Sequence, residues 1–205
     1  MGYDIRLKSK NVFNSYLTLG LLQIGRDNNP CKIISRGKIF SKIPREMGVK
    51  DSRIIGRYID DIKKWLSNDP LTKNSVMQIL ETKSKGTRLK NEIPEETYKD
   101  FVSALLLLNL IEDENHKELL EGTFVDNNEN SMSIITKLTI AKFNQVQIKI
   151  ELINNLGQIE FVPLKFRFNK KGWFILGKNI TEGNHEIELK LSSICTINYP
   201  NIIPQ

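Results

Sequence analysis

The chain has 205 residues, of which 40% are hydrophobic and 26% are charged, and its formal net charge is +6 at pH 7. This composition is typical of a globular protein and excludes the disordered, collagen-like and disulfide-rich classes. The longest wholly apolar run, residues 104–108, is far shorter than the roughly 20 residues of a membrane helix, so we expect no membrane partner. The start of the chain has no apolar stretch of the kind found in a signal peptide, and we therefore expect a cytoplasmic protein.

Few side chains in the sequence suit metal binding or catalysis. Cys31 and Cys195 lie far apart without a Cys-x-x-Cys spacing, and His116 and His185 are the only histidines. A zinc site, a disulfide framework and a histidine-based triad are therefore not expected. Because the sequence also lacks paired carboxylates, a glycine-rich phosphate loop and a nucleophile motif, we expect a protein that is not an enzyme and needs no cofactor.

Charge divides the chain into three zones. Residues 1–92 carry a net charge of +10, residues 93–132 carry −8, and residues 133–205 carry +4. A basic module beside an acidic connector is expected when one module binds a polyanion, although a solvated surface with incidental bias gives the same pattern. We expect an α+β protein in which the first zone is an N-terminal domain, the second a helical connector and the third a C-terminal domain.

The N-terminal domain begins with helical periodicity. Apolar side chains recur at helical spacing over residues 12–24, and a shorter helical pattern over 35–47 must end or kink at Pro44. Gly48 and Val49 form a predicted turn, after which Asp51 or Ser52 suits the N-cap of a third helix. The predicted inner face of that helix holds Ile55, Tyr58 or Ile59, Ile62 and Leu66, and its outer face holds Arg53, Gly56, Arg57, Asp60 and Lys64.

Two short strands, 76–80 and 85–89, are predicted after the third helix, around a polar turn at 81–84. This order predicts a winged helix-turn-helix, which places the start of its third helix in the major groove of DNA. A merely solvated basic face is the alternative, and charge, helix order and hairpin together favour DNA contact over it. The residues expected to contact DNA are Lys38, Lys42, Ser52, Arg53, Arg57, Lys64, Lys83, Lys85 and Arg88, with Lys90 at the outer edge of the hairpin.

The C-terminal domain is predicted to be a helix followed by short strands. A helical pattern over 134–143 leads into alternation of apolar and polar residues. Short strands joined by tight turns predict a small, strongly bent sheet or barrel. The alternating segments are 146–152, 162–168 and 187–191, the continuous apolar run is 173–177, and further apolar residues stand at 194 and 197. The turns are 154–157, 169–172 and 182–184.

Several short motifs follow one another in this half of the chain. They are a helix with Ala141, the strand Val146-x-Ile148-x-Ile150, the pair Pro163-Leu164, the run Gly172-Trp173-Phe174-Ile175 and the end Leu189-x-Leu191-x-x-Ile194. In these motifs the chain resembles the WYL-domain family of bacterial transcription regulators. The upstream region of that family is similar to three further parts of the chain. They are the acidic connector with the apolar run 104–108, the motif Asp61-Ile62-x-x-Trp65 and the run Gly86-Thr87-Arg88-Leu89. The resemblance therefore covers most of the chain.

The resemblance implies an Sm-like β-barrel that senses a nucleic-acid or nucleotide ligand and passes the signal to a DNA-binding winged helix-turn-helix, commonly in a homodimer. The chain departs from the family at Phe174 and Ile175, which replace Tyr and Leu, and at Ile187, Ser193 and Asp60, which replace arginines. The expected ligand contacts are Lys165, Arg167, Trp173 and Lys178, with Lys170 and Lys171 nearby. A core strand with solvated lysines is the alternative interpretation of these residues.

Two functions of different classes remain open. The first is a transcription regulator, a repressor or a controller of its own operon, that binds duplex DNA through residues 1–92. The second is a non-catalytic accessory protein that binds single-stranded nucleic acid or a protein partner through the barrel, with the winged helix serving dimerisation. Base-edge donors on the third helix favour the first function, and a barrel groove that holds nucleic acid would favour the second.

Overall fold

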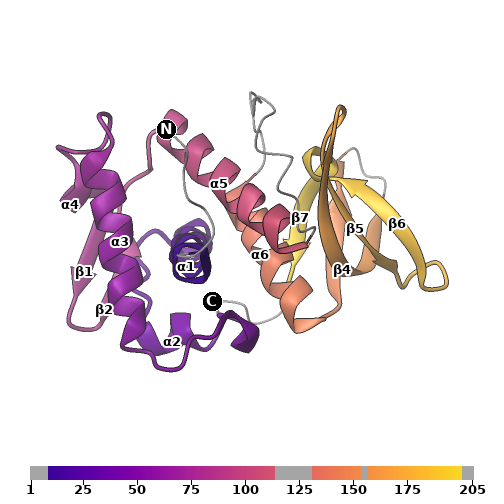
Figure 1. Ribbon diagram of the computed structural model, residues 1–205, viewed down its shortest axis with the longest axis horizontal. Coiled ribbons are helices and arrows are strands. Elements are labelled where there is room, and N and C mark those ends of the chain that lie inside the picture. The colour runs from indigo at the N-terminus through magenta and orange to yellow at the C-terminus, as the bar shows by residue number, and fades with distance from the viewer. Residues whose placement is uncertain (1–8, 114–130, 154–156, 200–205) are drawn as a thin grey trace. The chain divides into compact units, whose positions relative to one another are not determined.

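The computed structural model describes residues 9–113, 131–153 and 157–199. It combines helices with antiparallel strands (Figure 1), which confirms the α+β class. The chain divides into two compact units between Phe101 and Val102, within the helix α5 (Glu95–Asp113) that begins the expected connector. The rest of that connector, 114–130, and most of the expected turn at 154–157 lie outside the described residues. None of the described helices is long and apolar enough to cross a membrane.

The first unit begins with three helical pieces where two helices are predicted. The first is longer than predicted, and the helix predicted at 35–47 is broken at Pro44, because proline lacks the N–H that a continuous helix needs. Gly48 ends the last piece with a φ of 73°, a conformation that favours glycine. The pieces are α1 (Ser9–Asn28), α2 (Arg36–Phe40) and the 3-10 helix η1 (Arg45–Met47).

The helix α3 (Ile54–Asn68) begins slightly later than predicted. Arg53, rather than Asp51 or Ser52, precedes the first helical residue, and its side chain makes no capping hydrogen bond. Asp51 still contributes to the start of the helix, because its Oδ1 accepts the backbone N–H of Arg53 at 2.8 Å. The predicted faces of the helix are confirmed by burial. The buried side chains are Ile55, Tyr58, Ile59, Ile62 and Leu66, and the exposed ones include Arg53, Arg57, Asp60 and Lys64.

Buried contacts hold α3 against α1. Asn14 donates its amide to the carbonyl of Met47 at 3.1 Å and to the hydroxyl of Tyr58 at 3.3 Å. On the same two helices, Tyr16 stacks on Trp65 with ring centroids 4.5 Å apart. These contacts join α1, η1 and α3 in one core, so they fix which side of α3 faces outward.

The hairpin after α3 is displaced from its predicted position. Residues 76–79 form a helical turn, α4 (Val76–Ile79), and the strands are β1 (Leu80–Lys83) and β2 (Gly86–Leu89). The strand predicted at 76–80 is therefore wrong except at its last residue, and most of the turn predicted at 81–84 belongs to β1. Burial of Leu80 opposite Leu89 sets this register, since a shift of one strand by one residue would turn its leucine to the other face of the hairpin.

The hairpin also pairs with the segment before α2. Ile34 and Thr87 exchange backbone hydrogen bonds of 2.9 and 3.0 Å. Gly86 precedes this bridge with a φ of 150°, and a Cβ at that position would overlap the carbonyl group of Ile34. Only glycine therefore lets β2 approach this segment so closely.

The second unit contains α6 (Met132–Asn144) and a five-stranded antiparallel sheet in the order β6-β5-β4-β3-β7. The helix predicted at 134–143 and the succession of short strands are confirmed, and β4 is longer than predicted. The strands are β3 (Ile148–Leu152), β4 (Gln158–Asn169), β5 (Gly172–Asn179), β6 (His185–Lys190) and β7 (Ile194–Asn198), with the 3-10 helix η4 (Leu191–Ser193) before β7.

One face of this sheet is apolar and packs with α6. Phe161, Phe166 and Ile175 are fully buried, and α6 packs against β4 and β7. Polar contacts add to the packing, because Lys137 donates to the carbonyl of Ile197 at 3.1 Å and Asn109 of α5 donates to Thr139 at 2.9 Å. The core of the second unit thus lies between α6 and one sheet face.

Replacement of Gly86 by alanine should lower the free energy of unfolding by roughly 2–3 kcal/mol, because the new methyl group meets a backbone carbonyl at a φ that disfavours a side chain. Gly37→Ala is the matched control, since nothing lies within 4 Å of a Cβ there, and its stability should stay equal or rise by up to about 1 kcal/mol. Urea unfolding measures both variants. Equal stabilities would contradict the close approach of β2 to Ile34.

Candidate nucleic-acid interface

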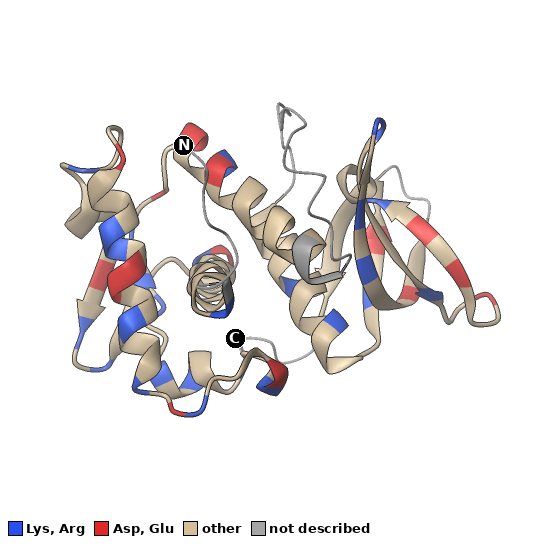
Figure 2. Cartoon of the chain, viewed as in Figure 1, with Lys and Arg blue, Asp and Glu red and all other residues tan. Residues whose placement is uncertain are grey.

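The outer side of α3 is an accessible basic surface of the first unit. Arg53, Arg57 and Lys64 are exposed there, interrupted by the exposed Asp60 (Figure 2). Arg53 and Arg57 are four residues apart, so their side chains leave the same side of the helix. From α2 to the end of α3, residues 35–68 carry nine Lys and Arg against four Asp and Glu. This segment therefore has the positive charge that a polyanion would meet.

Arg53 at the start of α3 is held by one carboxylate. Asp51 Oδ2 accepts a hydrogen bond from Arg53 Nε at 2.7 Å and pairs with Nη2, while Asp51 Oδ1 accepts the backbone N–H of Arg53 at 2.8 Å. The Arg53 side chain is nevertheless 90% exposed. The hydrogen bond from the Arg53 side chain keeps the pKa of Asp51 below its ordinary value, and the same bond raises the pKa of Arg53. Both groups are therefore charged at neutral pH.

A third arginine, which the sequence did not single out, lies beside these two. A Cβ built on Gly56 would lie 3.4 Å from Cζ of Arg36, so the guanidinium of Arg36 in α2 lies over the bare backbone of Gly56 in α3. Arg36 is exposed. The contact joins two helices, and no spacing along the chain indicates it. A methyl group at position 56 would be in ordinary van der Waals contact with this guanidinium.

The other expected contacts on α2 and α3 are less accessible. Lys38, Lys42 and Ser52 are half-buried. The backbone of Lys38 belongs to the first turn of α2, where its N–H is accepted by Ser35 Oγ at 3.3 Å. The carbonyl of Ser52 accepts the N–H of Ile55 at 3.2 Å, so Ser52 shapes the start of α3.

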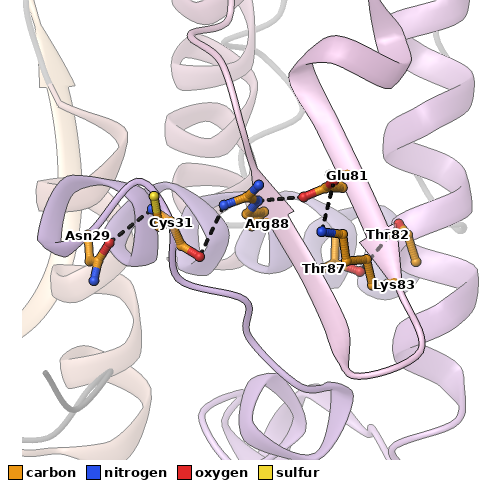
Figure 3. Close-up of polar contacts among 7 residues, drawn as sticks. All are labelled: Asn29, Cys31, Glu81, Thr82, Lys83, Thr87 and Arg88. Carbon is orange, nitrogen blue, oxygen red and sulfur yellow. Dashed lines mark hydrogen bonds and ion pairs between the residues drawn. The ribbon is translucent and has the colours of Figure 1, made fainter.

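The hairpin residues have unequal roles (Figure 3). Arg88 donates from Nε to Glu81 at 2.6 Å and from Nη1 to the carbonyl of Cys31 at 3.1 Å, and its side chain is only 17% exposed. Lys83 pairs with the same Glu81 at 3.3 Å. Arg88 therefore joins the two strands to the segment after α1, and the exposed Lys83, Lys85 and Lys90 are the more accessible cations of the hairpin.

Backbone pairing connects the hairpin with the arginines of α3. The bridge between Ile34 and Thr87 lies two residues before Arg36, and Arg36 in turn covers Gly56. The first unit thus brings the start of β2, the start of α2 and the first turns of α3 into one continuous region. Charge and residue spacing pointed to α3 and to the hairpin as parts of this region. They could not predict that both lie beside Arg36.

The four expected ligand residues of the second unit do not share one face of the sheet. Trp173 is buried, 6% exposed, and packs against Phe168 with ring centroids 4.7 Å apart. The strand registers place Lys165, Arg167 and Lys178 on the opposite face from the fully buried Phe166 and Ile175. The proposed stacking partner is therefore separated from the three cations by the sheet itself.

Acidic residues interrupt the basic face of the sheet. Arg167 lies 3.6 Å from Glu188, and Lys178 lies opposite Glu186 in the pairing of β5 with β6. Lys170 and Lys171 are exposed in the turn before β5. Within the described part of the chain no group of three or more His, Cys, Asp or Glu could hold a metal ion, and Cys31 and Cys195 are exposed free thiols.

Comparison with known proteins assigns no family. The chain matches no protein-family model and no curated protein sequence. The similarity to WYL-domain regulators therefore stays a prediction that depends on the motifs quoted above.

The ion pair of Glu81 and Arg88 in the hairpin should make the stability of the fold depend on pH. Arg88 lowers the pKa of Glu81 chiefly through its side-chain hydrogen bond. A lowered pKa stabilises the fold above the ordinary pKa of glutamate, and this stabilisation disappears as the pH falls through the lowered value. Glu81→Gln should reduce Tm at pH 7 by at most a few degrees, and its difference from wild type should shrink as the pH falls below the ordinary pKa of glutamate. Thermal unfolding followed by circular dichroism tests this, and a difference independent of pH would contradict the pairing.

Proposed function

We propose that this protein is a sequence-specific DNA-binding transcription regulator, a repressor whose first unit is a winged helix-turn-helix. The observation that carries the proposal is a group of three exposed arginines at the outer side of α3, whose inner side is buried: Arg53 and Arg57 at the start of α3, and Arg36 of α2, which lies over Gly56. In winged helix-turn-helix proteins the start of such a helix enters the major groove, where arginine donors pair with guanine.

The hairpin supports the same proposal. Its exposed lysines lie on β1, in the turn and directly after β2, and a backbone bridge holds β2 beside the segment that leads into α2. Lysines on a wing contact phosphates, which position a protein on the duplex without reading its sequence. Base contacts from α3 and phosphate contacts from the hairpin would together give specificity and affinity.

The second unit is proposed as an Sm-like barrel that senses a nucleic-acid or nucleotide ligand. A helix followed by five antiparallel strands, with β6 and β7 as the edges of the ladder, is compatible with a small bent sheet of that kind. We further propose a cytoplasmic homodimer, because two-fold half-sites would double a short recognition element.

The accessory-protein function has one observation in its favour. Lys165, Arg167 and Lys178 share a sheet face with the half-buried Phe174 and Leu176, so cations and apolar side chains are interleaved there, as in single-strand binding sites. Two acidic residues of β6 on the same face, Glu186 and Glu188, weaken its attraction for a polyanion.

Fluorescence anisotropy tests the proposed function directly. The full chain is titrated against the duplex upstream of its own gene and against an unrelated duplex of equal length, each over a salt series. A preference for the upstream duplex that persists at physiological salt is expected of a regulator. Equal binding of both duplexes that salt abolishes would contradict it and would reduce the first unit to a nonspecific basic surface.

The same assay separates base contacts from phosphate contacts. Arg53→Ala and Arg57→Ala should each weaken binding of the preferred duplex about tenfold and reduce discrimination, because they remove base-edge donors. Lys85→Ala should weaken both duplexes alike and reduce the salt slope by about one. Lys149→Ala, which removes an exposed cation from β3, is the matched control and should change neither. Full discrimination by the double arginine variant would exclude α3 as the recognition helix.

A further inference from the structure

Asp51 is an unexpected neighbour for a DNA-binding arginine. A carboxylate beside Arg53 repels phosphate and neutralises the cation that would attract it. If Arg53 served only as a phosphate contact, this pairing would weaken it. The geometry of the pair therefore indicates a different use of the guanidinium.

The guanidinium is a planar fork with five N–H donors. Asp51 binds its side edge, formed by Nε and Nη2. Because the group is planar, both N–H groups of Nη1 and the second N–H of Nη2 point away from the carboxylate. One N–H of Nη1 and the second N–H of Nη2 form the end edge of the fork, which can pair with O6 and N7 of guanine in the major groove.

Asp51 also limits the freedom of Arg53. A highly exposed arginine normally samples many rotamers, and fixing such a side chain on binding costs affinity. Asp51 binds both the backbone N–H and the side chain of Arg53, so the guanidinium is held in one position relative to the start of α3. The end edge of the guanidinium therefore has the orientation needed to contact one base before DNA binds.

We propose that Asp51 is a positioning residue that orients Arg53 to read one guanine per DNA half-site. The inference rests on the proposed function, because it requires the start of α3 to lie in the major groove. It deepens that function by naming the base that is read, the residue that reads it and the residue that holds the reader in place.

The direction of the change in DNA affinity distinguishes a positioning role of Asp51 from electrostatic repulsion. Removal of an acidic charge near DNA should strengthen binding to every duplex if Asp51 only repels phosphate. Removal of a positioning carboxylate should weaken binding to the preferred duplex and leave or strengthen binding to an unrelated one. Asp51→Asn is the suitable variant, because its amide oxygen still accepts the backbone N–H of Arg53 while the bidentate ion pair is lost.

The experiment uses the full chain and a duplex selected from a random pool by the wild-type protein. Each guanine in that duplex is replaced in turn by 7-deazaguanine, which lacks the N7 acceptor. Wild type should lose about tenfold in affinity at one guanine per half-site. Asp51→Asn should lose three- to tenfold on the unmodified duplex, and its penalty for 7-deazaguanine should fall to about twofold or less.

Two further variants serve as controls. Asp60→Asn removes an exposed charge on the same side of α3, where the carboxylate lies 3.6 Å from Lys63, and it should retain the full 7-deazaguanine penalty with equal or tighter binding of both duplexes. Arg53→Lys keeps the charge without the fork, and adding Asp51→Asn to it should cause no further loss. Thermal unfolding of each variant shows whether the fold is kept.

The outcomes separate the inference from the proposed function. Tighter binding of Asp51→Asn to both duplexes, with the 7-deazaguanine penalty unchanged, overturns the positioning role while the regulator proposal stands. Failure of the wild type to select any sequence overturns both. A penalty that disappears in Asp51→Asn and Arg53→Lys but persists in Asp60→Asn establishes the Asp51 and Arg53 pair as the reader of guanine.

Discussion

Burial of one side of α3 against α1 is the contact on which the candidate interface depends. Tyr58 and Ile62 lie in the core, Asn14 bonds to Tyr58, and Trp65 stacks on Tyr16. A helix held in this way cannot rotate about its axis without exposing its apolar side. The basic side is therefore presented outward by the hydrophobic core, so the backbone of the helix needs no reorientation when a partner binds.

The second constraint is the close pairing of the hairpin with the chain before α2. It requires glycine at position 86, and it brings the hairpin lysines, Arg36 and the first turns of α3 into one region of the first unit. Arg88 stabilises this pairing through hydrogen bonds to Glu81 and to the carbonyl of Cys31. The hairpin thus divides its basic residues between a structural contact and an exposed surface.

Periodicity alone predicted the helices and faces that depend on local pattern. The inner face of α3, the helix before the second sheet and the burial of Phe166 in β4 follow from the spacing of apolar residues. The alternation predicted for 162–164 is wrong, because a register shift between Pro163 and Lys165 buries Pro163 instead of its neighbours. The hairpin register was mispredicted because Val76–Ile79 is apolar enough for a strand, and only the burial of Leu80 opposite Leu89 decides the pairing. The helix break at Pro44 was predicted, because it follows from the N–H that proline lacks. The start of α3 at Ile54 was not, because the spacing of apolar residues does not fix where the first turn begins.

The sequence predicted several residues of the candidate site but not their arrangement in space. Charge and helical spacing identified Arg53 and Arg57, but neither could identify Arg36, whose relation to Gly56 crosses two helices. Nor could composition distinguish Arg88, which has protein partners, from the exposed Lys85. In the second unit, strand alternation would have placed Trp173 and the nearby cations on opposite faces had it been applied to them together.

The central claim is that duplex DNA covers the outer side of α3 and the hairpin. Lysine footprinting of the full chain tests it most directly, with an amine-reactive reagent applied with and without the duplex upstream of the gene and the modified sites read by mass spectrometry. The claim predicts that Lys64, Lys83 and Lys85 lose reactivity while Lys149 and Lys178 keep theirs. Protection of Lys165 and Lys178, with Lys64 and Lys85 unchanged, would contradict the claim and would favour nucleic-acid binding by the sheet of the second unit.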